Sequence, residues 1–108
     1  MEQYELATLS VIEGIENRTI AFEKAKLTVV SDYGTRLWYI DVDGIDDEPL
    51  LERFAESDEI GVRLEAVSIG GKRFGGRGFF HPNPRRRSAA IRGDGELEGY
   101  QPQTKRGE

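Results

Sequence analysis

The only histidine of this 108-residue chain, His81, is the first candidate for chemistry, because an imidazole can act as a general base near neutral pH. His81 stands beside Pro82 in a predicted loop, and none of the serines lies in a Gly-x-Ser-x-Gly elbow. A Ser-His-Asp triad would have to use His81, and no pattern marks a partner for it. We therefore predict that the protein is not an enzyme.

An acidic stretch is the second candidate, as a calcium site. Asp41, Asp43 and Glu52 have the spacing of positions 1, 3 and 12 of an EF-hand loop. Position 5 would then be Ile45, where an oxygen ligand is needed, and position 6 would be Asp46, where glycine is needed. Carboxylates just before a helix are also explained by the helix dipole. No metal site and no cofactor are predicted.

A basic, glycine-rich segment over residues 72–87 is the third candidate. It interleaves arginines, glycines and aromatic residues, and such a strand surface can stack bases and bind phosphates of single-stranded nucleic acid. In the structural alternative, the phenylalanines belong to the core and the glycines bend a strand at a barrel corner. The nucleic-acid hypothesis would use Arg73, Phe74, Arg77, Phe79, Arg85, Arg86 and Arg87.

Two resemblances accompany this segment. The triplet Arg85-Arg86-Arg87 near a glycine-rich turn is similar to the arginines with which PilZ domains bind cyclic dinucleotides before a β-barrel. The second PilZ motif, an acidic or Asn residue before Ser and Gly, does not occur here in the proper order, so no family is assigned. The compact, cysteine-free chain with Gly95-Glu96-Leu97-Glu98-Gly99-Tyr100 near its end resembles small accessory proteins of bacterial phages and mobile elements.

Strands must position most of these residues, and the clearest pair is a hairpin over residues 24–31 and 36–43 with its turn at Tyr33-Gly34. One register gives apolar pairs on one face and opposite charges on the other, as a half-buried antiparallel ribbon requires. The predicted pairs are Val29 with Trp38, Leu27 with Ile40, Ala25 with Val42, Val30 with Leu37, Lys26 with Asp41, and Lys24 with Asp43.

The charged face of this hairpin also carries Val30, Leu37 and Tyr39. If that face is exposed, these residues form an apolar patch with charged neighbours, which is typical of a protein contact. In the alternative, the barrel or the helix covers the patch.

Two strands are expected before the hairpin, over about residues 4–12 and 19–22. A change in the spacing of apolar residues between the second of these strands and the hairpin predicts a β-bulge near Glu23-Lys24. On the first strand, one side should carry Ala7, Leu9 and Val11.

A single helix is expected over residues 48–57. Asp47 can serve as its N-cap, and Pro49 in the first turn loses no hydrogen bond there. A helix this short must dock on the sheet to be stable.

The remainder of the chain again reads as strands, with a hairpin whose two-residue loop is Gly70-Gly71. This loop places Val67 opposite Phe74 and requires a bulge at Gly75-Gly76. A loop over residues 81–87 follows. A last hairpin closes at residues 93–95, and its expected pairs are Arg92 with Glu96 and Ile91 with Leu97.

About eight short strands and one helix predict a mainly β fold, a small antiparallel β-barrel or rolled sheet, with OB-like and SH3-like barrels both compatible. Residues 1–100 are expected to form one domain and residues 101–108 a polar tail. The chain has no cysteine, no apparent signal sequence and no apolar run long enough to span a bilayer, so a cytoplasmic location is expected.

The net charge of −5 is unevenly distributed, with 15 acidic and 5 basic side chains in residues 1–60 and 5 acidic and 10 basic ones in residues 61–108. We expect the two halves to interleave in the fold, which largely removes the asymmetry. The leading hypothesis is a non-catalytic protein-interaction or structural, accessory module that binds a protein partner or itself through an exposed strand edge or the outer patch. The nucleic-acid hypothesis is the alternative.

Overall fold

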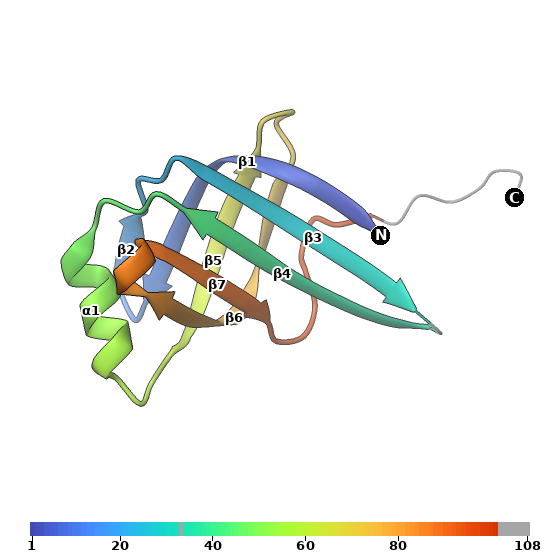
Figure 1. The fold of residues 1–108 in the computed structure, drawn as a ribbon. Helices are drawn as coiled ribbons and strands as arrows, with labels where there is room; N and C mark the ends of the chain where they lie inside the picture. Colours follow the sequence, from blue (N-terminus) through green and yellow to red (C-terminus); the bar gives the residue numbers. More distant parts are fainter. Residues whose placement is uncertain (33, 102–108) are drawn as a thin grey trace, which may run out of the picture.

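The computed structural model describes residues 1–32 and 34–101, which form a mainly β fold with one short α-helix (Figure 1). Tyr33 and the part of the expected tail from residue 102 onward lie outside the described residues. The helices are α1 (Glu48–Glu56) and the 3₁₀ helix η1 (Pro84–Arg86). The strands are β1 (Glu2–Glu13), β2 (Glu16–Thr19), β3 (Lys24–Asp32), β4 (Thr35–Asp43), β5 (Gly61–Ser68), β6 (Arg73–Asn83) and β7 (Ser88–Gly93).

Six of the strands close into an antiparallel barrel in the order β1-β3-β4-β7-β6-β5, with β5 pairing back to β1. Strand β1 reaches three neighbours because it is long. Its residues 2–5 pair with β3, its residues 10–13 pair with β2 further along the same edge, and its residues 6–12 pair with β5 on the opposite edge. The small-barrel prediction is confirmed, but the expected interleaving of the acidic and basic halves is wrong. The barrel strands of the acidic half, β1, β3 and β4, lie side by side, and those of the basic half, β7, β6 and β5, form the other side of the barrel.

The β3–β4 hairpin has the predicted register at every pair, from Lys24 opposite Asp43 to Val30 opposite Leu37. Its inner face is buried, with Leu27 and Ile40 fully excluded from solvent. On the outer face Lys26 and Asp41 are cross-strand neighbours, although no lysine–aspartate pair of this hairpin comes within ion-pairing distance in the described part of the chain.

The prediction that Ala7 lies on the inner side of β1 is wrong. The register between β1 and β5 shifts between Leu6 and Thr8, as in a β-bulge, so Leu6 is buried and Ala7 is exposed. Leu9 and Val11 point into the barrel as expected.

The strand expected over residues 19–22 is also displaced. The observed strand β2 ends at Thr19, and residues 21–23 form a connection in which the amide of Glu23 donates to the carbonyl of Asp43 at 3.0 Å. No bulge is needed near Glu23-Lys24, because the chain leaves β2 before it enters β3 and the apolar spacing restarts there.

The β5–β6 hairpin corrects the predicted turn. Its loop has three residues, 69–71, and is flanked by a hydrogen bond from the Ser68 amide to the Lys72 carbonyl at 2.8 Å. Phe74 lies opposite Ala66 instead of Val67, and the ladder runs without interruption past Gly75-Gly76, so the predicted bulge is absent. Because the loop has three residues and not two, every pair predicted for this hairpin is displaced by one residue.

The predicted last hairpin does not form either. Strand β7 pairs with β6 on one edge and with β4 on the other, and residues 96–98 contribute only an isolated bridge between Gly75 and Glu98. The expected loop over residues 81–87 is partly strand, because β6 continues to Asn83 before η1. Leu97 still reaches the core and is buried.

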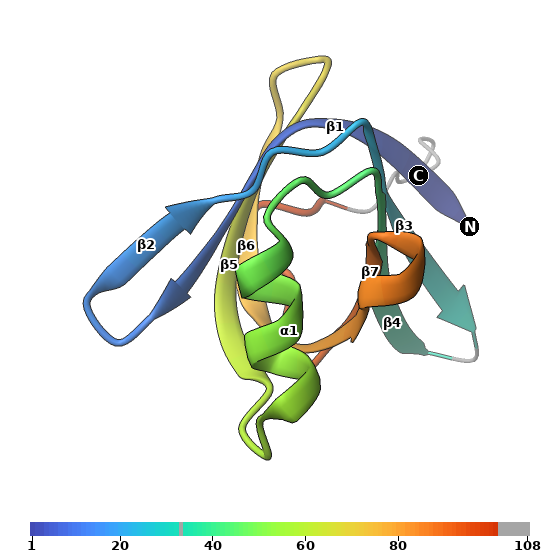
Figure 2. The same cartoon turned by 60° about the vertical axis from the view of Figure 1, so that its left-hand side comes forward.

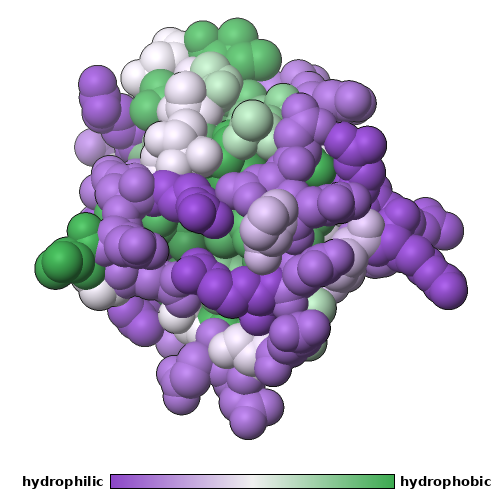
Figure 3. All heavy atoms as spheres, turned by 90° about the vertical axis from the view of Figure 1, so that its left-hand side faces the viewer, coloured by the Kyte–Doolittle hydropathy of each residue, from purple (hydrophilic) through white to green (hydrophobic). Residues whose placement is uncertain are grey.

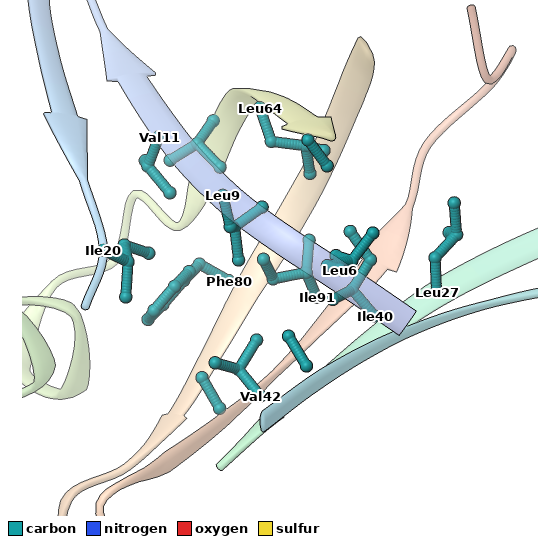
Figure 4. Packing of buried hydrophobic residues seen from close by; sticks show 14 of the residues in the cluster. Leu6, Leu9, Val11, Ile20, Leu27, Ile40, Val42, Leu64, Phe80 and Ile91 are labelled. Carbon is teal, nitrogen blue, oxygen red and sulfur yellow. The ribbon is translucent and has the colours of Figure 1, made fainter. Parts of the chain in front are cut away.

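Apolar side chains from all six barrel strands meet inside, as the labelled residues in Figure 4 illustrate. Helix α1 lies across one end of the barrel (Figures 1 and 2) and covers it with Leu50, Leu51 and Phe54. The Phe54 ring packs on Phe80 with 4.7 Å between ring centroids. The predicted helix and its cap are confirmed, since Asp47 Oδ1 accepts a hydrogen bond from the Leu50 amide at 3.1 Å. None of the helices among the described residues is long and apolar enough to cross a membrane.

Candidate functional site

The arginines of the predicted nucleic-acid site do not gather on one surface. Arg73 and Arg77 are exposed on the outer face of β6, whereas Arg85 and Arg86 are exposed on η1 beyond the other end of that strand. Asn83, at the end of β6, lies six positions after Arg77, which corresponds to roughly 20 Å along a strand. The basic segment therefore supplies two separate groups of cations.

Two further members of that predicted site have structural contacts of their own. Phe74 is only 4% exposed, and its ring packs on Tyr4 with 5.0 Å between centroids, so it presents no free face to a base. Arg87 adopts a left-handed conformation with φ of 54° after η1, pairs with Asp46, and donates from Nε to the Ile45 carbonyl at 3.5 Å. Arg87 thereby links η1 to the segment that leads into α1.

Phe79 and Tyr39, in contrast, are brought together by the sheet. Tyr39 of β4 lies opposite Arg92 of β7, and Arg92 lies opposite Phe79 of β6. All three side chains are on the outer face of neighbouring strands, where strand spacing places adjacent members roughly 5 Å apart. We call these three residues the aromatic–arginine row.

Apolar surface continues from the row along β4. Leu37 lies two residues before Tyr39 on the same face and is 63% exposed, and half-buried Val30 lies opposite Leu37 on β3. Tyr39 is 37% exposed and Phe79 is 41% exposed. The predicted contact patch is therefore a solvent-facing surface that extends across four strands, from Val30 on β3 to Phe79 on β6.

A hollow of about 400 Å³ borders this surface at the open end of β4 and β7. Trp38 forms part of its wall and donates a hydrogen bond from Nε1 to the Gly95 carbonyl at 3.0 Å. Leu37 connects the hollow to the row. The lining residues are Arg36, Leu37, Trp38, Gly93, Gly95, Glu96 and Leu97.

Two arginines stand on this face. Arg92 stands within the row, and Arg77 lies two residues before Phe79 on the same face of β6. Neither Arg77 nor Arg92 forms an ion pair with another described residue. Their guanidinium groups are therefore available to bind carboxylates or phosphates from outside.

The next arginine across the sheet is already neutralised. Arg63 of β5 lies opposite Arg77 and binds the Glu98 carboxylate with both terminal nitrogens, at 2.7 Å and 3.1 Å. This hydrogen bonding lowers the pKa of Glu98 and raises the pKa of Arg63. On the β5 side of this face, the arginine next to Arg77 is therefore not available to a partner, because Glu98 already binds it.

His81 lines a different hollow of about 620 Å³, on the outer face near the α1 end. Ala90 lies between His81 and Asp41 in the ladder, so the two side chains start two strands apart, roughly 10 Å. Within residues 1–32 and 34–101, no three His, Asp or Glu side chains gather as metal ligands would.

Arg92 is the member of the row that is absent from both predicted sites. The predicted pair of Arg92 with Glu96 belongs to a hairpin that does not form, and Arg92 instead lies between β4 and β6. The alternation of buried Ala89 and Ile91 with outward Arg92 is the signal that could have placed it on an outer face.

Comparison of the chain with protein-family models, with curated proteins and with solved structures found no match.

Proposed function

We propose that this protein is a non-catalytic protein-binding module whose binding surface is the aromatic–arginine row together with Leu37 and Arg77. The observation that carries the proposal is the ladder itself, which aligns Tyr39, Arg92 and Phe79 on three adjacent strands. The accessory, phage-related role and the cytoplasmic location remain predictions from the sequence.

The residue types on this surface are those that dominate protein interfaces. Tyrosine, phenylalanine and arginine are enriched in interfaces, and tyrosine and arginine are enriched among the residues that contribute most to binding. The barrel core is already filled from the inner faces of the strands, so Leu37 and Phe79 are not needed to complete it. A binding partner would account for their exposure, because the folded core does not require them.

The chemistry of the surface also describes the partner. Arg77 and Arg92 would pair with carboxylates, and Leu37, Tyr39 and Phe79 would pack on apolar side chains. The hollow beside Leu37 could receive one apolar side chain of the partner, which is the usual form of an interface anchor. We therefore expect a protein surface that combines acidic and apolar residues.

Site-specific photo-crosslinking tests this proposal. A photoreactive phenylalanine analogue replaces Phe79, and a matched control carries it at Ile69, which is 68% exposed on the β5–β6 loop away from the row. In the source cells, position 79 should yield a discrete crosslinked species that Arg92→Glu abolishes. Equal crosslinking from both positions, or a species unaffected by Arg92→Glu, would contradict the proposal.

Single-stranded nucleic acid is a second candidate ligand, supported by the same row, because aromatic and arginine side chains on neighbouring strands can stack bases and bind phosphates. Anisotropy of a fluorescent oligonucleotide at increasing salt tests it. If this candidate is right, Arg77→Ala with Arg92→Ala weakens binding strongly, whereas Arg85→Ala with Arg86→Ala, which removes the same charge, has little effect. Equal losses in both pairs would indicate only non-specific attraction.

A further inference from the structure

Strand β2 has an unpaired edge. Every barrel strand has two neighbours, whereas β2 pairs only with β1 among the described strands. The β1–β2 hairpin projects away from the barrel (Figure 2), and all four residues of β2 are exposed. Ile15, in the turn before β2, is fully exposed, and Figure 3 shows an apolar projection on the side where Figure 2 places this hairpin.

The backbone groups on this edge can be assigned from the ladder. Glu13 and Glu16 flank a two-residue turn, so they form a hydrogen-bonded pair, and such pairs recur at every second residue. The bond from the Ile20 amide to the Leu9 carbonyl at 2.9 Å agrees with this alternation. The amides and carbonyls of Asn17 and Thr19 consequently point away from β1 and can accept another strand.

A second copy of the same edge can satisfy these groups in only a few two-fold, antiparallel registers. Registers centred on Glu16 or on Arg18 would place like charges directly opposite each other, which is destabilising. The register centred on Asn17 instead places Glu16 opposite Arg18 of the second copy, twice by symmetry. It also pairs Asn17 with Asn17 of the second copy through two backbone hydrogen bonds.

The charges around β2 favour the same register. Glu16 lies opposite Glu13 within the hairpin, and Glu13 already pairs with Arg53, whereas Glu16 has no ion pair with any residue in the described ranges. Arg18 pairs with Asp47 at 3.3 Å but keeps a side chain that is 48% exposed. Its guanidinium has enough donors to bind Glu16 of a second copy as well.

We propose that β2 is a self-association edge, through which two copies of this chain pair antiparallel about Asn17 and extend the sheet from one molecule to the other. The row used in the proposed function lies on β4, β7 and β6, so the dimer would leave that face free. The paired segment is short, and we expect a weak dimer that depends on protein concentration.

Cysteine crosslinking tests the register directly, because the natural chain contains no cysteine. In the proposed dimer the two Asn17 Cα atoms lie about 5.5 Å apart, within the range of a disulfide. The two copies of Ile15 are offset by four residues, roughly 14 Å, which is too far. In a glutathione redox buffer, Asn17→Cys should therefore form covalent dimers at least about tenfold faster than Ile15→Cys.

Ile15→Cys is a stringent control, because Ile15 is at a fully exposed tip and random collisions would oxidise it at least as readily. In the Asn17→Cys background, Glu16→Arg or Arg18→Glu alone should slow dimer formation, and the double exchange should restore it. Thermal melts of each variant establish that the barrel is folded. Faster oxidation of Ile15→Cys, or a rate unaffected by the single charge reversals, would overturn the proposal.

Discussion

The backbone of Gly93 lies directly against the indole ring of Trp38. A Cβ atom at position 93 would fall 2.2 Å from Cε2 of that ring, and one at Gly76 would fall 3.1 Å from Cζ2. Trp38 thus fills one end of the barrel because two neighbouring strands present no side chain there. Both glycines provide volume for the tryptophan, and Gly76 lies in a regular ladder instead of the bulge expected at Gly75-Gly76.

Gly93→Ala should accordingly destabilise the barrel. The added methyl has to displace the indole, and such overpacking typically costs about 1–3 kcal/mol. Urea unfolding followed by tryptophan fluorescence measures the loss. Gly61→Ala is the matched control, since its Cβ would have no neighbour closer than 3.6 Å, and it should change stability by less than about 0.5 kcal/mol. Similar losses in both variants would mean that Trp38 does not limit the space at Gly93.

Truncation of two adjacent phenylalanines to alanine should reduce the stability of the fold by very different amounts. Phe80 is fully buried and packs on Phe54, so Phe80→Ala should cost about 3–5 kcal/mol. Phe79 faces solvent, and Phe79→Ala should cost less than about 1 kcal/mol. Chemical denaturation of both variants checks the alternation of β6. A large loss for Phe79→Ala would place its ring in the fold instead of on the binding surface.

The cap of α1 gives a third prediction. Asp47→Ala removes the side-chain acceptor for the Leu50 amide and should reduce stability by about 0.5–2 kcal/mol. Asp47→Asn keeps an acceptor and should lose less, although it weakens the pair with Arg18. Thermal unfolding of the two variants separates the stability contributed by the cap hydrogen bond from the stability contributed by the charge of Asp47. Equal losses would show that the charge of Asp47, and not its cap, stabilises the helix.

The Arg63–Glu98 pair gives a pH prediction. Because the pKa of Glu98 is lowered by its hydrogen bonds to Arg63, the pair contributes stability above the ordinary pKa of a glutamate, and that contribution is lost as pH falls through the lowered value. Arg63→Gln should raise the pKa of Glu98 toward its ordinary value of 4.5. NMR titration of the carboxyl carbon measures the shift. Arg77→Gln, which removes the same charge across the ladder, should leave it nearly unchanged.

Local patterns in the sequence were sufficient where they involve one turn or one helix. The β3–β4 register and the α1 cap follow from alternation, cross-strand charge and capping chemistry, and both agree with the structure. The β5–β6 register was predicted wrongly, because both a two-residue and a three-residue loop are compatible with Gly70-Gly71. The choice of loop length shifts every pair in that ladder.

The row was only partly predictable because its strands are joined by non-local pairing. Tyr39 and Phe79 were each singled out, but as members of two different hypotheses, since nothing local indicates that β7 lies between β4 and β6. Arg92 connects them only in the folded barrel. Its role was hidden by the plausible but incorrect turn at residues 93–95.

The barrel is completed by its last strand, since β7 inserts between β4 and β6. The seam between β1 and β5 needs the chain only as far as residue 68, but a ribosome synthesising this protein has to extend it to residue 93 before β4 and β6 gain their second neighbours. Until then, one edge of each of these two strands stays open. Nascent chains that end between β6 and β7 are therefore a stage at which chaperones, or aggregation with neighbouring chains, would compete with folding.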